Sequence, residues 1–494
     1  MRCAALRQPT TNPIPVLGIL AQLPSYLSSP LHLLFTMGSL WEYVGRSPKP
    51  KTSAASQITT QIVSQVNTHI TKPLNRFRLE LSPVQLYAAG GVVSVTLLVL
   101  FNSLRSSPPI IPAPRETVIP QMAPENLRDI PYPLEALPGA RDVDSPYGST
   151  RVYEFGPRDG PKVLLIHGIS TPCIALASLA HKLADKGCRV MIFDLFSRGH
   201  SSGPSATVRP YDSALYTSQI LVVLQSSSLS WNSSNPFTIV GYSLGGALAA
   251  DFTSYFPRLV SNLVLIAPGG IIRTSHITLR SRMLYSPSGL IPEWMVRKLV
   301  AQRLWTGPDT ARSIEPEPDT LDTADAESLS GRSDRSERSE RRRSSKRDPT
   351  YISSEFSLLP PNPNSTVGRV VDWQVSHHRG FVPAFISTIR HAPIHNQHDR
   401  WRLIGERMKN GSGPLRRVNI VLGENDPIII ADEISEDARE VLGDDYCNVH
   451  IVKGADHDVA IDRFDDVARV VLRELGLKSK SHKTRSAVGG SSRR

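Results

Sequence analysis

The segment that most constrains the fold is residues 237–246, Phe-Thr-Ile-Val-Gly-Tyr-Ser-Leu-Gly-Gly, which the small-residue run 247–250 follows. An apolar strand, a Gly-x-Ser-x-Gly turn and a helix in this order predict a nucleophile elbow, which holds a serine above the edge of a sheet. Gly241 and Gly245 are expected where a Cβ atom would collide with a neighbouring strand or helix. Ser243 is therefore the candidate nucleophile.

Two later strands end in residues that could complete a catalytic triad. Residues 418–422 lead into Gly-Glu-Asn-Asp-Pro, and residues 449–452 lead into Lys-Gly-Ala-Asp-His. Because the carboxyl ends of parallel strands meet at one edge of a sheet, Asp426 and His457 are expected near the serine. His457 would accept the hydroxyl proton, and Asp426 would fix the tautomer of the imidazole. Glu424 is the alternative acid, and Asp426 could instead cap the helix that follows.

A fourth element is the strand and loop at residues 163–169, Val-Leu-Leu-Ile-His-Gly-Ile. Acyl transfer needs fixed N–H dipoles aimed at the developing oxyanion. The backbone N–H groups of Ile169 and Leu244 are the two candidate donors. His167 and Gly168 are expected to support this loop rather than to react.

Together these motifs resemble the α/β-hydrolase superfamily, in its capped esterase- and lipase-like class, over roughly residues 150–476. Residues 191–202, Met-Ile-Phe-Asp-Leu-Phe-Ser-Arg-Gly-His-Ser-Ser, are similar to the family's Asp-x-x-Gly-x-Gly-x-Ser segment. Ser197 stands where the first glycine is usual, which puts the shape of that turn in doubt. The resemblance implies an α/β fold, with a mostly parallel sheet and helices on both of its faces.

The identity of the elbow residue separates this chain from related enzymes. Epoxide hydrolases and haloalkane dehalogenases of this fold use aspartate there, whereas a serine suits attack on an acyl carbon. A carboxylesterase- or lipase-like serine hydrolase with a lipophilic acyl substrate is the leading interpretation. A C–C bond hydrolase or a serine peptidase on the same scaffold is the first alternative, and a non-catalytic binding or scaffold protein is the second. The sequence holds no metal-binding spacing, Walker loop or dinucleotide fingerprint, so neither a metal nor a cofactor is expected.

Charge is distributed unevenly along the 494 residues, whose formal net charge is +11. The excess lies in residues 1–83 and in the tail from residue 478 onward. Residues 1–80 are predicted to be a basic, largely unstructured region, and residues 478–494 a basic disordered tail. A nucleic-acid partner is not expected, because that function needs a basic patch on the folded domain.

Residues 81–104 contain no charged side chain. A transmembrane helix is expected over residues 81–105, because residues 84–104 are long enough for a hydrocarbon core of about 30 Å. This span would attach a single-pass protein to a membrane. The flanking charges and the sequons at Asn232, Asn364 and Asn410 favour a lumenal or extracellular hydrolase domain over a cytosolic one.

Composition also predicts the division into domains. Residues 106–147 are rich in proline and are expected to form a linker to a core at residues 148–274 and 414–477. About 150 residues separate the strand at 263–266 from the strand at 418–422, which predicts an inserted helical cap over residues 275–413. Aromatic side chains of this cap could pack onto the core or line an acyl pocket, and His377 and His378 are expected at its surface. The insert 307–350 has no aromatic residue and is expected to be disordered.

Overall fold

The computed structural model describes residues 109–277, 279–286, 291–305 and 354–477, with six further positions from residue 82 to residue 96. The chain divides into two compact units, residues 1–104 and 105–494. The fold and the candidate site belong to the second unit.

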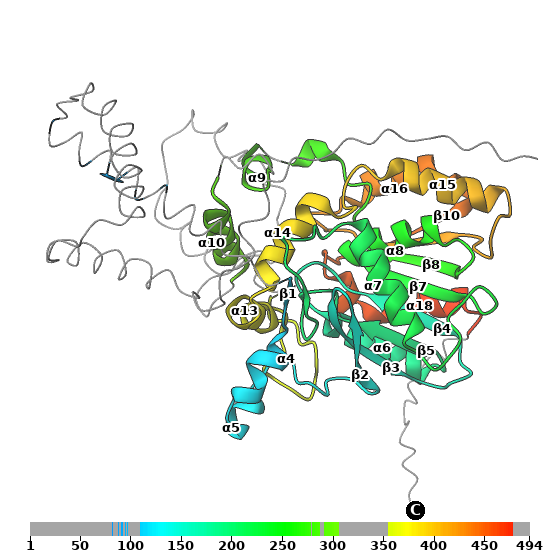
Figure 1. Ribbon diagram of the computed structural model, residues 1–494. Coiled ribbons are helices and arrows are strands. Elements are labelled where there is room, and N and C mark those ends of the chain that lie inside the picture. The colour runs from blue at the N-terminus through cyan, green and yellow to red at the C-terminus, as the bar shows by residue number, and fades with distance from the viewer. Residues whose placement is uncertain are drawn as a thin grey trace, which may run out of the picture. The chain divides into compact units, whose positions relative to one another are not determined.

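An eight-stranded sheet with the order β10-β9-β8-β7-β4-β5-β3-β2 forms the centre of this unit (Figure 1). Strand β3 pairs antiparallel with both β2 and β5. The other six strands, β5, β4, β7, β8, β9 and β10 in their order across the sheet, are parallel. The predicted mostly parallel sheet is therefore confirmed. The strands are β2 (Ala140–Ser145), β3 (Gly148–Phe155), β4 (Lys162–Ile166), β5 (Arg189–Phe193), β7 (Phe237–Tyr242), β8 (Val260–Ile266), β9 (Val418–Gly423) and β10 (Cys447–Val452).

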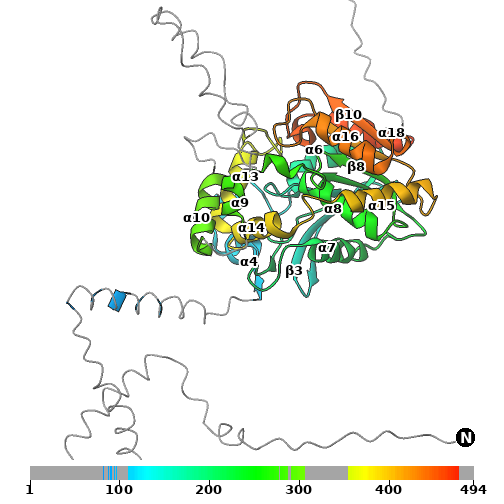
Figure 2. The same ribbon diagram turned by 90° about the horizontal axis from the view of Figure 1, so that it is seen from above.

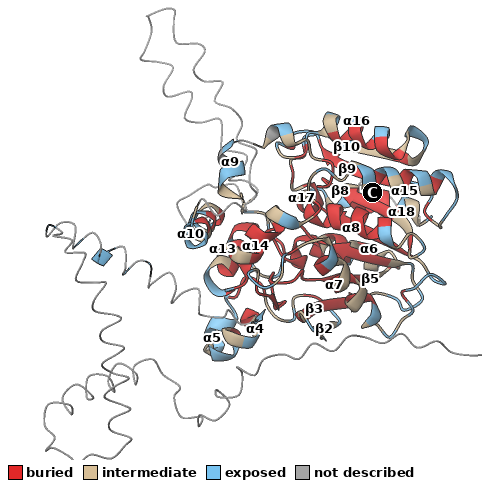
Figure 3. Ribbon diagram, turned by 45° about the horizontal axis from the view of Figure 1, so that its top comes forward, coloured by how far each residue is buried: buried red, intermediate tan, exposed pale blue. Residues whose placement is uncertain are grey.

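Helices cover both faces of the sheet (Figure 2). Helices α6 (Ala177–Asp185) and α18 (Phe464–Glu474) pack against each other on one face. On the other face, each helix contacts the next in the row α7 (Ser213–Gln225), α8 (Leu244–Tyr255), α15 (His398–Lys409) and α16 (Ala431–Leu442). The central strands are thus buried on both sides, which explains their continuous apolar runs (Figure 3). Shorter elements are β1 (Ile110–Ile111), α4 (Pro114–Thr117), η1 (Ile119–Gln121), α5 (Pro124–Leu127), η2 (Cys173–Leu176), β6 (Gly203–Pro204), η3 (Thr274–His276), η5 (Asp444–Tyr446) and α17 (Val459–Asp462).

The helical cap leaves the sheet where the sequence predicts, between β8 and β9. These two strands pair directly, with Leu263 opposite Val418. The inserted helices are α9 (Leu279–Leu284), α10 (Glu293–Leu304), α13 (Val367–His377) and α14 (Phe381–His391). Helix α15 packs on α8 and α16, so it is the crossover helix that a parallel connection needs. The cap therefore ends before His398, earlier than the expected boundary at residue 413.

The segment 106–147 differs from the expected linker. Strand β2 extends the main sheet beside β3, and β1 pairs with β6. Tyr132 is fully buried, and its hydroxyl donates to Asp194 at 2.9 Å. Sequence analysis missed β2 because this strand contains charged side chains, which are tolerated at the edge of a sheet. Two of them form ion pairs with β3: Arg141 with Glu154 and Asp142 with Arg151.

The predicted transmembrane span requires a correction, and with it the expected single-pass membrane localisation. Within the described part of the chain, no helix is long and apolar enough to cross a membrane. The longest helix whose bounds the structure gives is α7, with 13 residues, and its length of about 20 Å is short of a hydrocarbon core of about 30 Å. Most of residues 81–105 lie outside the described residues, as do residues 1–80, 307–350 and 478–494.

Candidate active site

Ser243 lies at the turn between β7 and α8 and has a backbone φ of 53°. A non-glycine residue rarely adopts this left-handed conformation, so surrounding contacts must hold it. Its N–H donates to the carbonyl oxygen of Ile266 in β8 at 2.9 Å, and its own carbonyl accepts from Gly246 and Gly269. The elbow is therefore anchored to the neighbouring strand and to the loop that follows it.

Gly241 and Gly245 lie where the turn leaves no room for side chains. A Cβ atom on Gly241 would overlap the carbonyl group of Gly245. A Cβ atom on Gly245 would overlap the carbonyl group of Ile166 at the end of β4. Both clashes involve backbone atoms, so a side-chain rotation cannot relieve them.

The structure brings Ser243, His457 and Asp426 together at the carboxyl edge of the sheet. Nε2 of His457 lies 3.1 Å from Oγ of Ser243, and its Nδ1 lies 2.8 Å from Oδ2 of Asp426. All three residues are buried, with exposures of 6–8%. Because a carboxylate only accepts, Nδ1 carries the proton, and Nε2 is left to accept from the serine hydroxyl.

The two candidate acids face different ways. Oδ1 of Asp426 accepts from the N–H groups of Ile428 and Ile429, each at 2.8 Å, which fixes its carboxylate beside His457. Glu424 is exposed, and its Oε2 accepts from the N–H of Gly454 at 2.8 Å. Asp426 therefore contacts His457, whereas Glu424 stabilises the loop that precedes His457.

The loop after β4 lies against the elbow. A Cβ atom on Gly168 would lie 3.5 Å from Cβ of Ser243. Among the described residues, neither the N–H of Ile169 nor that of Leu244 has an acceptor. Leu244 is the first residue of α8, so its N–H is one of the unsatisfied donors at the positive end of that helix. These two N–H groups therefore remain the candidate oxyanion donors.

His167 holds this loop from within the core. Its Nε2 lies 2.9 Å from the N–H of Leu195, which can only donate, so Nδ1 carries the proton and donates to the carbonyl of Gly168 at 2.8 Å. Burial lowers the pKa of His167 to about 3, so the ring stays neutral. The carbonyl of Gly168 and the N–H of Ile169 belong to one planar peptide unit, and His167 therefore orients that N–H.

Ser197 keeps the turn that a glycine usually forms in the segment after β5. Its φ is 58°, in the left-handed region. The side chain is fully buried, and its Oγ lies 2.6 Å from the hydroxyl oxygen of Tyr211. This hydrogen bond gives the buried hydroxyl of Ser197 a partner and helps to hold the residue in that conformation.

The expectation that both cap histidines lie at the surface is wrong for His378. His377 is exposed, but His378 is only 2% exposed, and its Nε2 lies 3.0 Å from the carbonyl oxygen of Ser201. Burial lowers the pKa of His378 to about 4. The sequence does not predict this contact, because Ser201 belongs to a distant loop. Gln374 and Thr388 also reach core loops from the cap, and sequence analysis missed them for the same reason.

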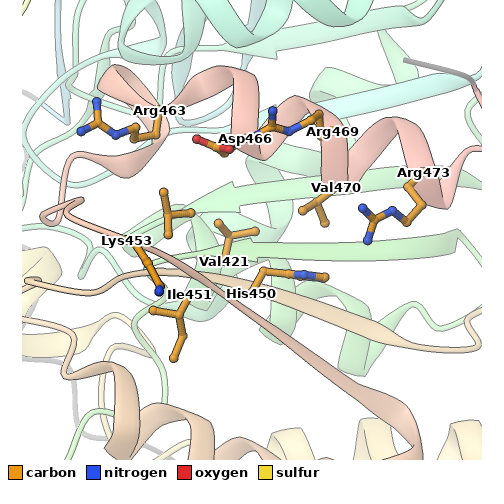
Figure 4. Close-up of a pocket in the computed structure, with 10 residues that line it drawn as sticks. Val421, His450, Ile451, Lys453, Arg463, Asp466, Arg469, Val470 and Arg473 are labelled. Atoms are coloured by element: carbon orange, nitrogen blue, oxygen red, sulfur yellow. Dashed lines mark ion pairs between the residues drawn. The ribbon is translucent and has the colours of Figure 1, made fainter. Parts of the chain in front are cut away.

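A basic cavity of about 400 Å³ lies apart from the triad, between edge strand β10 and helix α18 (Figure 4). Its lining includes Lys453, Arg463, Arg469 and Arg473 but only one acid, Asp466, which forms an ion pair with Arg469. Ser243, Asp426 and His457 do not line it. This cavity is therefore separate from the candidate site.

A mostly parallel sheet with an elbow between β7 and α8 and a cap inserted after β8 defines an α/β hydrolase. Residues 163–470 match the model of the alpha/beta hydrolase family, which is more than half of the chain. The chain belongs to the α/β-hydrolase family.

Individual relatives match over shorter stretches. An uncharacterized protein of Mycobacterium tuberculosis is 31% identical over 155 residues, which cover 31% of this chain and 42% of the relative. A serine hydrolase-like protein of Homo sapiens is 31% identical over 121 residues, which cover 24% of this chain and 56% of the relative. Among solved structures, the esterase RhEst1 from Rhodococcus is 14% identical with a TM-score of 0.43, covering 69% of this chain and all of that one.

Proposed function

We propose that this α/β hydrolase is a serine hydrolase that cleaves carboxylic esters through an acyl-enzyme on Ser243. One observation carries the proposal: the hydrogen bonds from Ser243 to His457 and from His457 to Asp426, 3.1 and 2.8 Å long, at a strained elbow. This is the arrangement of nucleophile, base and orienting acid that activates a serine hydroxyl.

In the proposed mechanism, Oγ of Ser243 attacks the ester carbonyl while Nε2 of His457 takes its proton. The N–H groups of Ile169 and Leu244 bind the resulting oxyanion. His457 then returns the proton to the departing alkoxide, which leaves the acyl group on the serine. A water molecule, deprotonated by His457, hydrolyses the acyl-enzyme, and Asp426 stabilises the imidazolium in both halves of the reaction.

The proposed substrate is an ester with a lipophilic acyl group. Support comes from cap helices α9 and α10, where large apolar side chains are exposed rather than packed. Exposed apolar side chains offer contact area to an apolar ligand. They are Leu279, Met283, Trp294, Met295 and Leu299, with Trp305 directly after α10.

Hydrolysis of p-nitrophenyl acetate, butyrate and octanoate by the wild type and by Ser243→Ala tests this function. The wild type should release p-nitrophenol with a burst equal to one acyl group per chain, and kcat/KM should rise with chain length. Ser243→Ala should show neither burst nor turnover. Fastest hydrolysis of the acetate would contradict the lipophilic substrate, and hydrolysis retained in Ser243→Ala would contradict the serine mechanism.

A further inference from the structure

Three consecutive carbonyl groups in the loop after β4 each accept a hydrogen bond from a fully buried side chain. The residues that supply these donors are far apart in the sequence, and only one of them belongs to the loop itself. The hydrogen bonds are His167 Nδ1 to Gly168 O at 2.8 Å, Arg198 Nε to Ile169 O at 3.1 Å, and Gln374 Nε2 to Ser170 O at 2.9 Å.

Gln374 belongs to cap helix α13, yet its amide joins two loops of the core. Its Nε2 donates to Ser170, and its Oε1 accepts from the N–H of Gly199 at 2.8 Å. The N–H of Gly199 can only donate, so the amide has only one orientation that satisfies both contacts. This one cap side chain therefore fixes the loop after β4, which carries the candidate donor Ile169, relative to the loop after β5.

Arg198 connects the same loop to a second cap helix. Besides Ile169, it donates through Nη2 to Oγ1 of Thr388 in α14, at 2.9 Å. Arg198 is fully buried, and its described hydrogen bonds go to uncharged oxygens, of Ile169, Phe196 and Thr388. An arginine in this position depends on its hydrogen bonds, because a buried charge without partners is costly. The contact between Arg198 and Thr388 is therefore expected to fix the loop after β5 against cap helix α14.

The N–H of Ile169 and the carbonyl of Gly168 belong to one planar peptide unit, so the contact from His167 acts on this N–H directly. The contacts from Arg198 and Gln374 hold the next two peptide units, and they act on this N–H through the backbone dihedral angles of Ile169 and Ser170. We propose that Gln374 and Thr388 are positioning residues through which the cap sets the geometry of the oxyanion donor. The donor is then complete only when α13 and α14 are seated on the core. This inference rests on the proposed serine hydrolase mechanism.

Two cap variants and a matched control test the inference. Gln374→Met removes both amide contacts at similar length, and Thr388→Val removes, at similar shape, the hydroxyl that contacts both Arg198 and the hydroxyl of Tyr216. Ser376→Ala, at an exposed position of α13, is the control. The measurements are kcat and KM for p-nitrophenyl butyrate and the inhibition constant of a trifluoromethyl ketone, whose adduct with a serine hydroxyl carries an oxyanion.

Loss of one oxyanion donor costs about 10²–10³-fold in kcat, so its displacement should cost about 10–100-fold. We expect kcat and trifluoromethyl ketone affinity to fall by the same factor in both cap variants, with KM and the control nearly unchanged. A rise in KM alone, or unchanged ketone affinity, would overturn the inference. If Gln374→Met does not fold, Thr388→Val decides the outcome.

Deuterium uptake separates this inference from the proposed function. The peptide covering residues 167–176 should exchange faster in both cap variants than in Ser376→Ala, whether or not the protein hydrolyses esters. Unchanged uptake would contradict the cap contacts themselves. A wild type that exchanges as expected but has no esterase activity would instead contradict the proposed function.

Discussion

Nδ1 of His457 lies 2.8 Å from Oδ2 of Asp426, although 31 positions separate the two residues in the sequence. They follow the adjacent parallel strands β10 and β9, so the sheet brings the two loops to the same edge. The second oxygen of Asp426 is held by the backbone N–H groups of Ile428 and Ile429. The carboxylate is thereby fixed before any substrate binds.

This contact distinguishes the two candidate acids. Asp426→Asn should reduce kcat by about 10⁴-fold, because the amide favours the wrong tautomer of His457. Glu424→Gln should change kcat little, because the side chain of Glu424 accepts only from the backbone N–H of Gly454 among the hydrogen bonds described. Steady-state hydrolysis of p-nitrophenyl butyrate measures both. A larger loss in Glu424→Gln than in Asp426→Asn would show that the acid is misassigned.

The elbow glycines make a steric prediction. Gly245→Ala should destabilise the protein by about 1–3 kcal/mol or more, because its Cβ atom meets the backbone of Ile166. It should also displace Ser243 and abolish turnover. Gly269→Ala is the matched control, since Gly269 donates to the carbonyl of Ser243 but a Cβ there would find its nearest neighbours at 3.5 Å. Urea unfolding of both variants tests this, and equal stability would argue against the tight turn.

Trimming the N-terminus tests where the folded unit begins. Deletion of residues 1–105 should leave a cooperatively unfolding hydrolase, because the described contacts of the fold begin after that point. Deletion of residues 1–147 should not, because it removes β2 and Tyr132 and uncovers the edge of β3. Size-exclusion chromatography and thermal unfolding compare the two. A stable, monomeric product of the longer deletion would show that the segment 106–147 is a linker after all.

A structural feature of this protein could be predicted from the sequence where its determinants lie within one short segment. The elbow around Ser243 combines strand, turn and helix signals within ten residues, and the sheet order then fixes where Asp426 and His457 must lie. Strand β2 escaped prediction because its charged side chains are satisfied by partners in β3. The burial of His378 and Gln374 escaped because each depends on loops more than 170 residues away. Neither helix periodicity nor composition contains that information.

Buried neutral histidines predict a loss of stability in acid. His378 has a pKa of about 4 in the folded protein, against about 6.5 when unfolded, so the unfolded chain binds the extra proton between these values. Stability is therefore complete above about pH 6.5 and falls toward pH 4, by about 1.4 kcal/mol per pH unit for this group. His167 and His200, each with a pKa of about 3, act in the same direction.

Urea unfolding between pH 7 and pH 5 measures this slope. His378→Gln should make the slope shallower by about one proton, because glutamine does not titrate while its amide can still donate to Ser201. His377→Gln, the exposed neighbour, should leave the slope unchanged. Equal slopes in the wild type and in His378→Gln would contradict the buried neutral state of His378.

The most direct test of the central claim is the site at which a fluorophosphonate attaches. The probe requires an activated serine but no knowledge of the substrate. Peptide mapping by mass spectrometry should find one adduct, on Ser243, and Ser243→Ala should remain unlabelled under the same conditions. Asp426→Asn should label far more slowly, because its histidine has lost the correct tautomer. A folded wild type that does not react, or an adduct on another residue, would contradict the assignment of Ser243 as the nucleophile.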